Sequence, residues 1–239
     1  MRPDNRTPFE MRPVRIATDF LQTAEGSALI EVGNTRVLCA ATIEQTIPQF
    51  LRGTGRGWVT AEYSMLPRST VTRTPREVSK GRPSGRTHEI QRLIGRSMRS
   101  VVDMTLLGER TIILDCDVLQ ADGGTRTASV TGAFVAMGLA LKRMLECGAI
   151  KKNPIRDYVA AISTGIVGGE ALTDLCYEED SRAEVDMNVV MTGAGRFVEV
   201  QATAEQTPFD DESMATLLRL ARTAIGQLVE IQKGILQLP

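Results

Sequence analysis

The sequence predicts an α/β or α+β fold in which helices pack on mixed β-sheets. Strand-like segments are mixed with three long helical segments along the chain. One of those helical segments is apolar nearly all round, which is typical of a helix buried inside a domain. No linker, low-complexity run or break in composition divides the 239 residues. We therefore expect one domain covering residues 1–239, although a chain of this length can also hold two.

The first expected element is a β-hairpin. Its strands cover 27–32 and 35–43, and the Gly33-Asn turn between them has the sequence that tight hairpin turns favour. Residues 57–66 are the next strand. The stretch 67–85 is rich in Pro, Ser, Thr, Gly and Arg, which predicts a long basic loop.

Helices and strands are both expected after this loop. A helix over about 87–104 carries apolar residues at helical spacing on one face, and 111–119 is a strand. Residues 125–147 form the buried helix, with Gly148 as its C-terminal cap. The last helix covers about 211–232, with Asp210 as N-cap and Gly234 just past its end. Three further strands are expected at 158–167, 184–191 and 196–203.

Charge is distributed unevenly along the chain. The net charge is only −1, but residues 52–99 hold eleven Lys or Arg against three Glu, a local charge of +8. Residues 170–186 hold seven acidic residues against one Arg. This separation favours a basic surface that binds a polyanion. Aromatic residues are scarce, which argues against base stacking as the main grip on nucleic acid.

The cysteines and the N-terminus indicate a reducing compartment. No two cysteines are close enough for a CxxC unit, and each lies in or beside an apolar run, so we expect four buried free thiols. The N-terminus lacks an apolar signal region, and no stretch approaches the ~20 apolar residues of a membrane span. We therefore expect a cytoplasmic protein with no membrane partner. The cysteines are Cys39, Cys116, Cys147 and Cys176.

The segment DGGTRT lies between a predicted strand and the buried helix, and is a candidate phosphate site. Glycines let backbone N–H groups approach an oxyanion, and the helix N-terminus adds free donors. Thr125 supplies a hydroxyl and Arg126 a planar cation. The alternative is a tight turn with only a structural role. The segment is not a Walker A loop, because GxxxxGK[ST] does not occur.

Asp180, Glu184 and Asp186 form a second candidate group. If the strand begins at Glu184, then Glu184, Asp186 and Asn188 project from one face, and Asp180 in the preceding turn can fold back toward them. Paired carboxylates can bind Mg²⁺, and one of them can act as a general acid. The alternative is a solvated acidic strand edge.

The basic loop and the only histidine complete the candidates. His88 has no metal-binding or nucleophile motif around it, so a surface role is favoured over catalysis. Arginines spaced along an extended loop suit a phosphate backbone; the alternative is an oligomer interface with the acidic stretch 170–186. Arg86, just before the helix, is expected to point inward. The basic residues are Arg68, Arg73, Arg76, Lys80, Arg82 and Arg86.

Taken together, these motifs resemble the ribonuclease PH family of phosphate-dependent 3′-exoribonucleases, which trim tRNA precursors. Matching segments cover essentially the whole chain, and the most specific is LDCDVLQADGGTRTASVTGA; others are AEGSALIEVGNTRVLCAAT, GWVTAEYSMLPRST and FVEVQATAE. Asn5 stands where the family commonly has Gly. Because Asn tolerates positive φ better than most residues, we expect little change there.

The resemblance implies a fold, an activity and partners. The fold is a single RNase PH-type domain, ribosomal protein S5 domain 2-like. The activity removes 3′-terminal nucleotides as nucleoside diphosphates, with inorganic phosphate as co-substrate, and is reversible. RNA, chiefly tRNA precursors, is the substrate, and the assembly is a homohexamer made as a trimer of dimers. Arg68, Arg73 and Arg76 match basic positions linked to ring assembly and tRNA binding.

The resemblance also assigns roles in the site. The carboxylates Asp180 and Asp186 match the two catalytic residues, which are thought to hold Mg²⁺ and supply acid. Two other functions remain as alternatives: a non-catalytic RNA-binding subunit of an exosome-like ring, and a metal-dependent nuclease that uses water. The first predicts a damaged turn or missing carboxylates, and the second leaves the GGTR turn unexplained. The phosphate-binding positions are Arg86, Gly124, Thr125 and Arg126.

Overall fold

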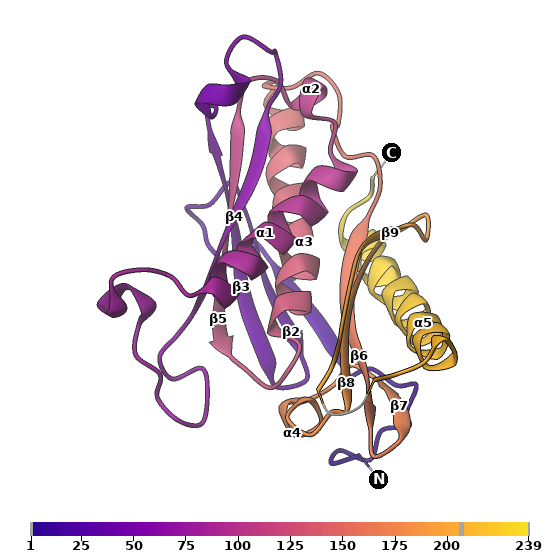
Figure 1. The fold of residues 1–239 in the computed structure, drawn as a ribbon. Helices are drawn as coiled ribbons and strands as arrows, with labels where there is room; N and C mark the ends of the chain where they lie inside the picture. The colour runs from indigo at the N-terminus through magenta and orange to yellow at the C-terminus, as the bar shows by residue number, and fades with distance from the viewer. Residues whose placement is uncertain (1, 206–207, 239) are drawn as a thin grey trace.

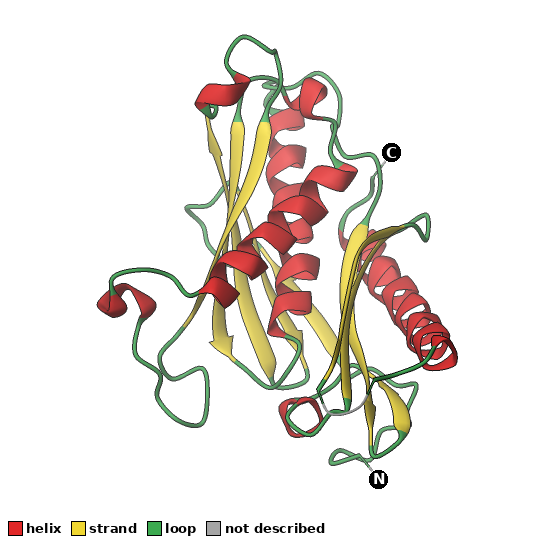
Figure 2. Cartoon of the chain, in the orientation of Figure 1, coloured by secondary structure: helices red, strands yellow, loops and turns green. Residues whose placement is uncertain are grey.

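The computed structural model describes residues 2–205 and 208–238 and shows layers of sheet and helix (Figures 1 and 2). A five-stranded sheet is covered on one face by α1 (Gly85–Val101) and α3 (Thr125–Glu146). A four-stranded sheet contacts α3 on one side and α5 (Asp211–Ile235) on the other. The α/β class expected from the sequence is confirmed.

The five-stranded sheet is mixed and has the order β1-β2-β3-β5-β4. Its neighbours are antiparallel except β4 and β5, which run parallel. Parallel neighbours need a crossover between them, and here α1 provides it. The strands are β1 (Val14–Thr18), β2 (Gly26–Val32), β3 (Thr35–Glu44), β4 (Trp58–Met65) and β5 (Thr111–Gln120).

The four-stranded sheet is antiparallel throughout, with the order β7-β6-β8-β9. Its strands are β6 (Val159–Val167), β7 (Glu170–Thr173), β8 (Val185–Thr192) and β9 (Phe197–Ala204). Two one-turn α-helices lie in the connections. They are α2 (Met104–Leu107) and α4 (Tyr177–Asp180), the second of which leads into β8.

Helix α3 is the central element of the core. It packs against β2, β3 and β5 of one sheet and β6 of the other, and Phe134 in its middle is fully buried. Truncating such a side chain to Ala costs about 3–5 kcal/mol. A Cβ on Gly26 would overlap the backbone of α3 at Ala136, so glycine there lets β2 and the helix approach closely.

Helix α3 is more apolar than we expected from the sequence. By length and composition alone this helix could cross a membrane, contrary to our expectation that no stretch approaches a span. However, 78% of its most apolar window is buried inside the protein. Its apolar character is therefore accounted for by the two sheets that it contacts.

Most expected elements are confirmed, and the errors have local causes. Helix α1 starts at Gly85, because the Ser84 side chain accepts a hydrogen bond from Thr87 N–H and caps it, and it ends where Val102 becomes extended. Helix α5 continues to Ile235, so Gly234 lies inside it rather than beyond its end. The expectation missed the short elements β1, β7, α2 and α4, which span too few residues to show a clear period.

The structure also tests what we expected of Asn5 and of the four cysteines. Asn5 has φ +59°, the left-handed conformation that Asn was expected to tolerate. Three cysteines are buried free thiols, but Cys147 is exposed at the C-terminal end of α3. Met144 and Ile150 near it in the sequence are buried, whereas Cys147 itself lies where the helix ends.

Candidate active site

The candidate site is a cleft of about 850 Å³ where β5 leads into α3 and where α4 leads into β8. These ends of the elements lie in the lower half of Figure 1. This volume is in the range of small-molecule and cofactor pockets. The structure brings together in this one cleft all six residues that the sequence proposed for phosphate binding and catalysis. They are Arg86, Gly124, Thr125, Arg126, Asp180 and Asp186.

The turn before α3 presents backbone donors to the cleft. Gly123 and Gly124 have φ of +73° and +66°, a conformation that side chains disfavour. Gly124 is the N-cap of α3 and offers no side-chain cap. Within the described residues, the backbone N–H groups of 125–127 have no acceptor. They therefore remain available to an anion at the positive end of the helix.

Tyr63 of β4 contacts the first residue of α3. Its hydroxyl lies 2.9 Å from the hydroxyl of Thr125, and either oxygen can donate. Burial raises the pKa of Tyr63, and the Thr125 hydroxyl and the charges of Arg86 and Arg126 oppose that rise. Tyr63 is thus a neutral hydrogen-bonding partner that orients Thr125. Sequence reasoning placed Tyr63 only within a strand.

The two aspartates face the same space from different elements. Asp180 is the last residue of α4, and Asp186 is the second residue of β8. Asn188, two residues along the strand, donates its amide to Asp186 at 3.2 and 3.4 Å. Burial, reinforced by the charge of Asp180, raises the pKa of Asp186 to about 6. Burial also raises the pKa of Asp180, against the nearby charges of Arg126 and Arg86.

Glu184 does not belong to this group, so its expected place was wrong. Strand β8 begins at Val185, and Glu184 lies outside the cleft, where its carboxylate accepts a hydrogen bond from Gly169 N–H at 3.2 Å. The alternation of strand side chains therefore applies only from Val185 onward.

The two arginines of the cleft have different surroundings. Arg126 donates to the side-chain oxygen of Gln201 at 2.9 Å, and the Gln201 amide donates to Glu89. Arg86, at the start of α1, lines the cleft and is solvent-exposed. Among the described residues it has no hydrogen-bond or ion-pair partner. Its guanidinium is free to bind an anion that enters.

The basic loop lies beside the cleft and projects from the body of the protein (Figure 1). Arg68 donates to the carbonyl of Val71 at 3.0 Å, and Arg73 is exposed. Arg76 lines a neighbouring hollow that also contains Arg86. Arg76 therefore adjoins the site, and none of the three arginines lines it.

Sequence reasoning missed several cleft residues on β9 and α1. On α1 the residue is Glu89, and on β9 the residues are Gln201 and Thr203, with Glu205 following on the same side. The period of two in FVEVQATAE was the signal that could have placed them together. His88, in contrast, is exposed, and among the described residues its ring forms a hydrogen bond with Gln91 at 3.3 Å, which agrees with the surface role expected for it.

The charges lining the cleft leave room for a cation. Four carboxylates face two arginines, which sums to −2 (2 − 4). Among the described residues, no group of three His, Cys, Asp or Glu side chains is arranged to hold a metal ion. Mg²⁺ commonly takes only one or two carboxylates and completes its shell with water and phosphate oxygens. Asp180 and Asp186 fit that requirement. The carboxylates are Glu89, Asp180, Asp186 and Glu205.

This arrangement defines a class of protein. A helix N-terminus, two arginines and two carboxylates in one cleft are the parts that enzymes of phosphoryl and nucleotidyl transfer use. Two parts of the chain, 10–141 and 157–224, match the models of domain 1 and domain 2 of the 3′ exoribonuclease family. The first part contains the five-stranded sheet and most of α3, and the second contains the four-stranded sheet.

Known proteins are similar to the chain over its whole length. It is 73% identical over 237 residues to Ribonuclease PH of Solibacter usitatus (strain Ellin6076), covering 99% of this chain and 100% of that protein. It is 59% identical to Ribonuclease PH of Moorella thermoacetica (strain ATCC 39073 / JCM 9320), covering 99% and 94%.

Solved structures share the fold at lower identity. The Archaeoglobus fulgidus exosome with RNA bound to the active site gives a TM-score of 0.82 at 24% identity, covering 96% of this chain and 92% of that one. Rice (Oryza sativa) Rrp46 gives 0.78 at 17%, covering 97% and 98%. The chain belongs to the 3′ exoribonuclease family, as the sequence motifs predicted.

Proposed function

We propose that the cleft binds inorganic phosphate beside the 3′ end of an RNA, and that the activity of this phosphorolytic 3′ exoribonuclease takes place there. The observation that carries this proposal is the joint presence, in one cleft, of an uncapped helix N-terminus, a free arginine and two carboxylates whose pKa values are raised. A subunit that only grips RNA would need none of these three.

Phosphate is held by groups from two elements. The N–H groups of 125–127, the Thr125 hydroxyl and the Arg126 guanidinium approach it from α3, and Arg86 approaches from α1. The helix dipole contributes only about 0.3–1 kcal/mol, so the arginines supply most of the binding. Gln201 holds the Arg126 side chain in place, and Tyr63 holds the Thr125 hydroxyl.

The reaction exchanges one phosphorus–oxygen bond for another. A phosphate oxygen attacks the phosphorus of the last phosphodiester, and a new P–O–P bond forms. The bond from that phosphorus to the 3′ oxygen of the preceding nucleotide breaks, and that oxygen takes a proton that Asp186 or Asp180 can deliver. The products are a nucleoside 5′-diphosphate and an RNA shortened by one nucleotide. Excess diphosphate runs the reaction backward.

Asp180 and Asp186 would hold Mg²⁺. When bound, the ion neutralises charge that builds up on the phosphate oxygens. The remaining work falls to the protein, in which the two arginines orient both phosphates. A phosphate bound at the helix N-terminus occupies the nucleophile's position in place of water, which favours release of diphosphates over hydrolysis to monophosphates.

The substrate that we propose is a tRNA precursor with an unpaired 3′ extension. Arg76 lines the hollow beside the cleft, and Arg68 and Arg73 lie on the same basic loop. These arginines can contact the backbone of the RNA body while its 3′ end enters the cleft. The similarity to proteins named Ribonuclease PH supports this substrate class.

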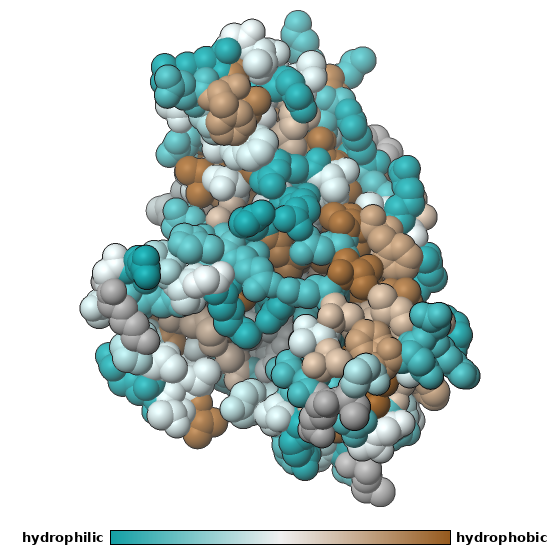
Figure 3. All heavy atoms as spheres, viewed as in Figure 1, coloured by the Kyte–Doolittle hydropathy of each residue, from teal (hydrophilic) through white to brown (hydrophobic). Residues whose placement is uncertain are grey.

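We further propose a hexameric ring in the cytoplasm. β9 is an edge strand with exposed Phe197 and Val200, and apolar surface gathers over it in Figure 3. An apolar edge strand favours pairing with another subunit. The fold shared with exosome core structures supports ring assembly. The free buried cysteines support a reducing compartment.

Product analysis tests the proposal. A short RNA with an unpaired 3′ tail is incubated with the protein and Mg²⁺, with and without inorganic phosphate. We expect nucleoside diphosphates only when phosphate is present, and no products from Asp186→Asn. His88→Ala is the matched control on the surface of α1 and should keep full activity. Monophosphates formed without phosphate would make the protein a hydrolase, and RNA binding without cleavage would make it a scaffold subunit.

A further inference from the structure

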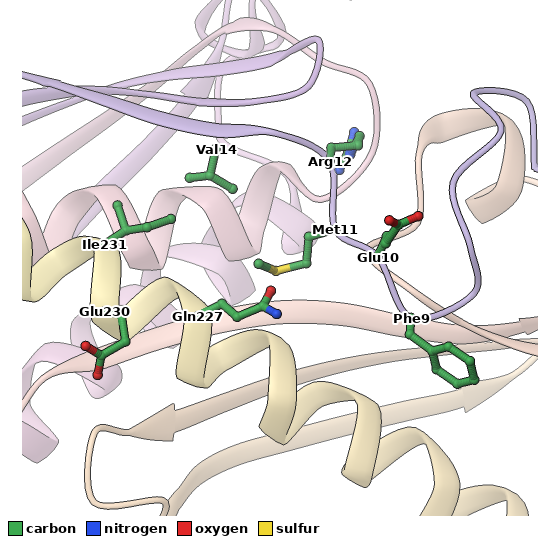
Figure 4. A pocket seen from close by; sticks show the side chains of 8 residues that line it. All are labelled: Phe9, Glu10, Met11, Arg12, Val14, Gln227, Glu230 and Ile231. Atoms are coloured by element: carbon green, nitrogen blue, oxygen red, sulfur yellow. The ribbon is translucent and has the colours of Figure 1, made fainter.

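The N-terminal segment, residues 2–12, lines none of the cleft but contacts both the phosphate-binding turn and the segment that carries Asp180. Three of its arginines bind residues 173–180, here called loop 173–180. This segment runs from the last residue of β7 through α4 and ends at Asp180. Arg12 is the most central of them: its side chain is 4% exposed, and that of its partner Asp174 is 2% exposed. Figure 4 shows Met11 directed toward α5 and Arg12 directed away from it.

Arg12 joins two halves of the site that come from distant parts of the chain. Toward loop 173–180, its Nε and Nη2 donate to the carboxylate of Asp174 at 2.9 and 2.7 Å. Toward the phosphate-binding turn, Nη1 donates to the carbonyl of Asp122 and Nη2 to that of Gly123 at 3.4 Å. One guanidinium therefore fixes the turn relative to the loop.

The two halves also pack directly on each other around Arg12. A Cβ on Gly123 would overlap the carbonyl of Leu175, and the Tyr177 N–H donates to the Asp122 carboxylate at 3.2 Å. A Cβ on Gly33 would lie 2.6 Å from Cδ of Arg12, so the hairpin turn is built around the same side chain.

Arg2 completes the link to Asp180. It binds Glu179, the residue just before Asp180, through Nε and Nη2 at 2.6 and 2.8 Å. It also donates to the carbonyls of Thr173 and Asp174 at 2.8 and 2.9 Å. Arg2 thus ties the two ends of loop 173–180 together, and Arg12 joins the start of this loop to the phosphate-binding turn.

We propose that the Arg12–Asp174 pair is a positioning element for phosphorolysis, which sets the separation between the phosphate-binding turn and Asp180. This inference rests on the proposed function of the cleft. Bound phosphate sits on the turn, and Asp180 acts from the loop, so the geometry of the transition state depends on the distance between them. A misplacement of about 1 Å can cost on the order of 100-fold in rate.

Arg12→Lys is the first test, because Lys keeps the charge but cannot reproduce the planar fork that bridges Asp174 and two carbonyls. We expect kcat per folded active site to fall about 10- to 100-fold, while the KM for RNA is unchanged. Asp174→Asn should also lower kcat and leave the KM for RNA unchanged, because Asn tolerates the φ of +55° at that position. The matched control is Arg143→Lys, since Arg143 also binds one aspartate and two carbonyls but lies far from the cleft.

Chemical rescue separates positioning from folding. In Arg12→Ala, millimolar guanidinium should restore part of kcat, whereas methylammonium should not. A loss of activity that merely follows the loss of folded protein, with kcat per active site unchanged, would overturn the inference. So would unchanged activity in Arg12→Lys. If the wild type itself releases no diphosphates, the proposed function fails instead, whatever the variants do.

Discussion

The acidity of Asp186 gives the sharpest prediction. Burial and the charge of Asp180 raise its pKa to about 6. A raised carboxyl pKa means that the group takes up a proton earlier as the pH falls. If Asp186 binds Mg²⁺ as an ionised carboxylate, a proton competes with the metal. The affinity for Mg²⁺ should therefore be full above pH 7 and decline as the pH falls through 6.

The magnitude follows from the titration. With a pKa of about 6, Asp186 is about 90% ionised at pH 7 and about 9% ionised at pH 5. The apparent Kd for Mg²⁺ should then rise about tenfold between these two values. Asp180, whose pKa is also raised, adds to the loss, so the two aspartates titrate as a pair.

Calorimetric titration of the protein with Mg²⁺ at several pH values measures this effect. Phosphate and RNA are left out so that their own titration does not contribute. Asp186→Asn is the control: it should bind Mg²⁺ weakly, and its remaining pH dependence should be much smaller. A Kd that stays constant from pH 7 to pH 5, or that rises only near pH 4, would refute the reasoning.

Three further predictions test other parts of the molecule. Arg126→Ala removes a cation from the phosphate site and should raise the KM for phosphate about tenfold or more, with the KM for RNA nearly unchanged; steady-state kinetics with varied phosphate checks this. Glu179→Gln leaves the buried Arg2 without its charge partner and should lower the free energy of unfolding by about 3–5 kcal/mol in urea denaturation. Burial alone would raise the pKa of Glu179, but Arg2 and the Cys176 N–H lower it. The wild type should therefore lose the free energy that the ionised Glu179 contributes as the pH falls below the usual glutamate range, whereas Glu179→Gln should not. Replacing Arg73 and Arg76 together with Ala should weaken the dependence of RNA binding on salt. The slope of log affinity against log salt concentration should become smaller by about 0.7 for each backbone phosphate that is no longer neutralised. A slope equal to that of the wild type would exclude binding of the RNA backbone by these residues.

Much of the fold and the site could be predicted because the signals are local. The apolar run of α3 and the glycines before it lie within one segment, so the sequence alone indicates a helix N-terminus suited to phosphate. Asp186 and Asn188 are two residues apart on one strand, and their shared face follows from the period of two. These signals need no knowledge of how distant segments meet.

The rest depends on contacts between segments far apart in the chain. Arg12 and Asp174 are 162 residues apart, and nothing in either neighbourhood indicates that they pair. Gln201 orients Arg126 only because β9 lies against α1 and brings the two side chains within hydrogen-bond distance. The misplacement of Glu184 had a different cause, since the exact first residue of a strand is set by its partner strands rather than by its own sequence.

The position of α3 between the two sheets affects how the chain can be divided. The buried Gln232 of α5 donates to the carbonyls of Thr131 in α3 and Val159 in β6, and Thr131 also binds Ala161 of β6. A fragment ending near residue 141 would expose one side of α3 and lose these partners. We therefore expect the two family-model regions to unfold in a single cooperative transition, and a fragment that contains only the first to aggregate.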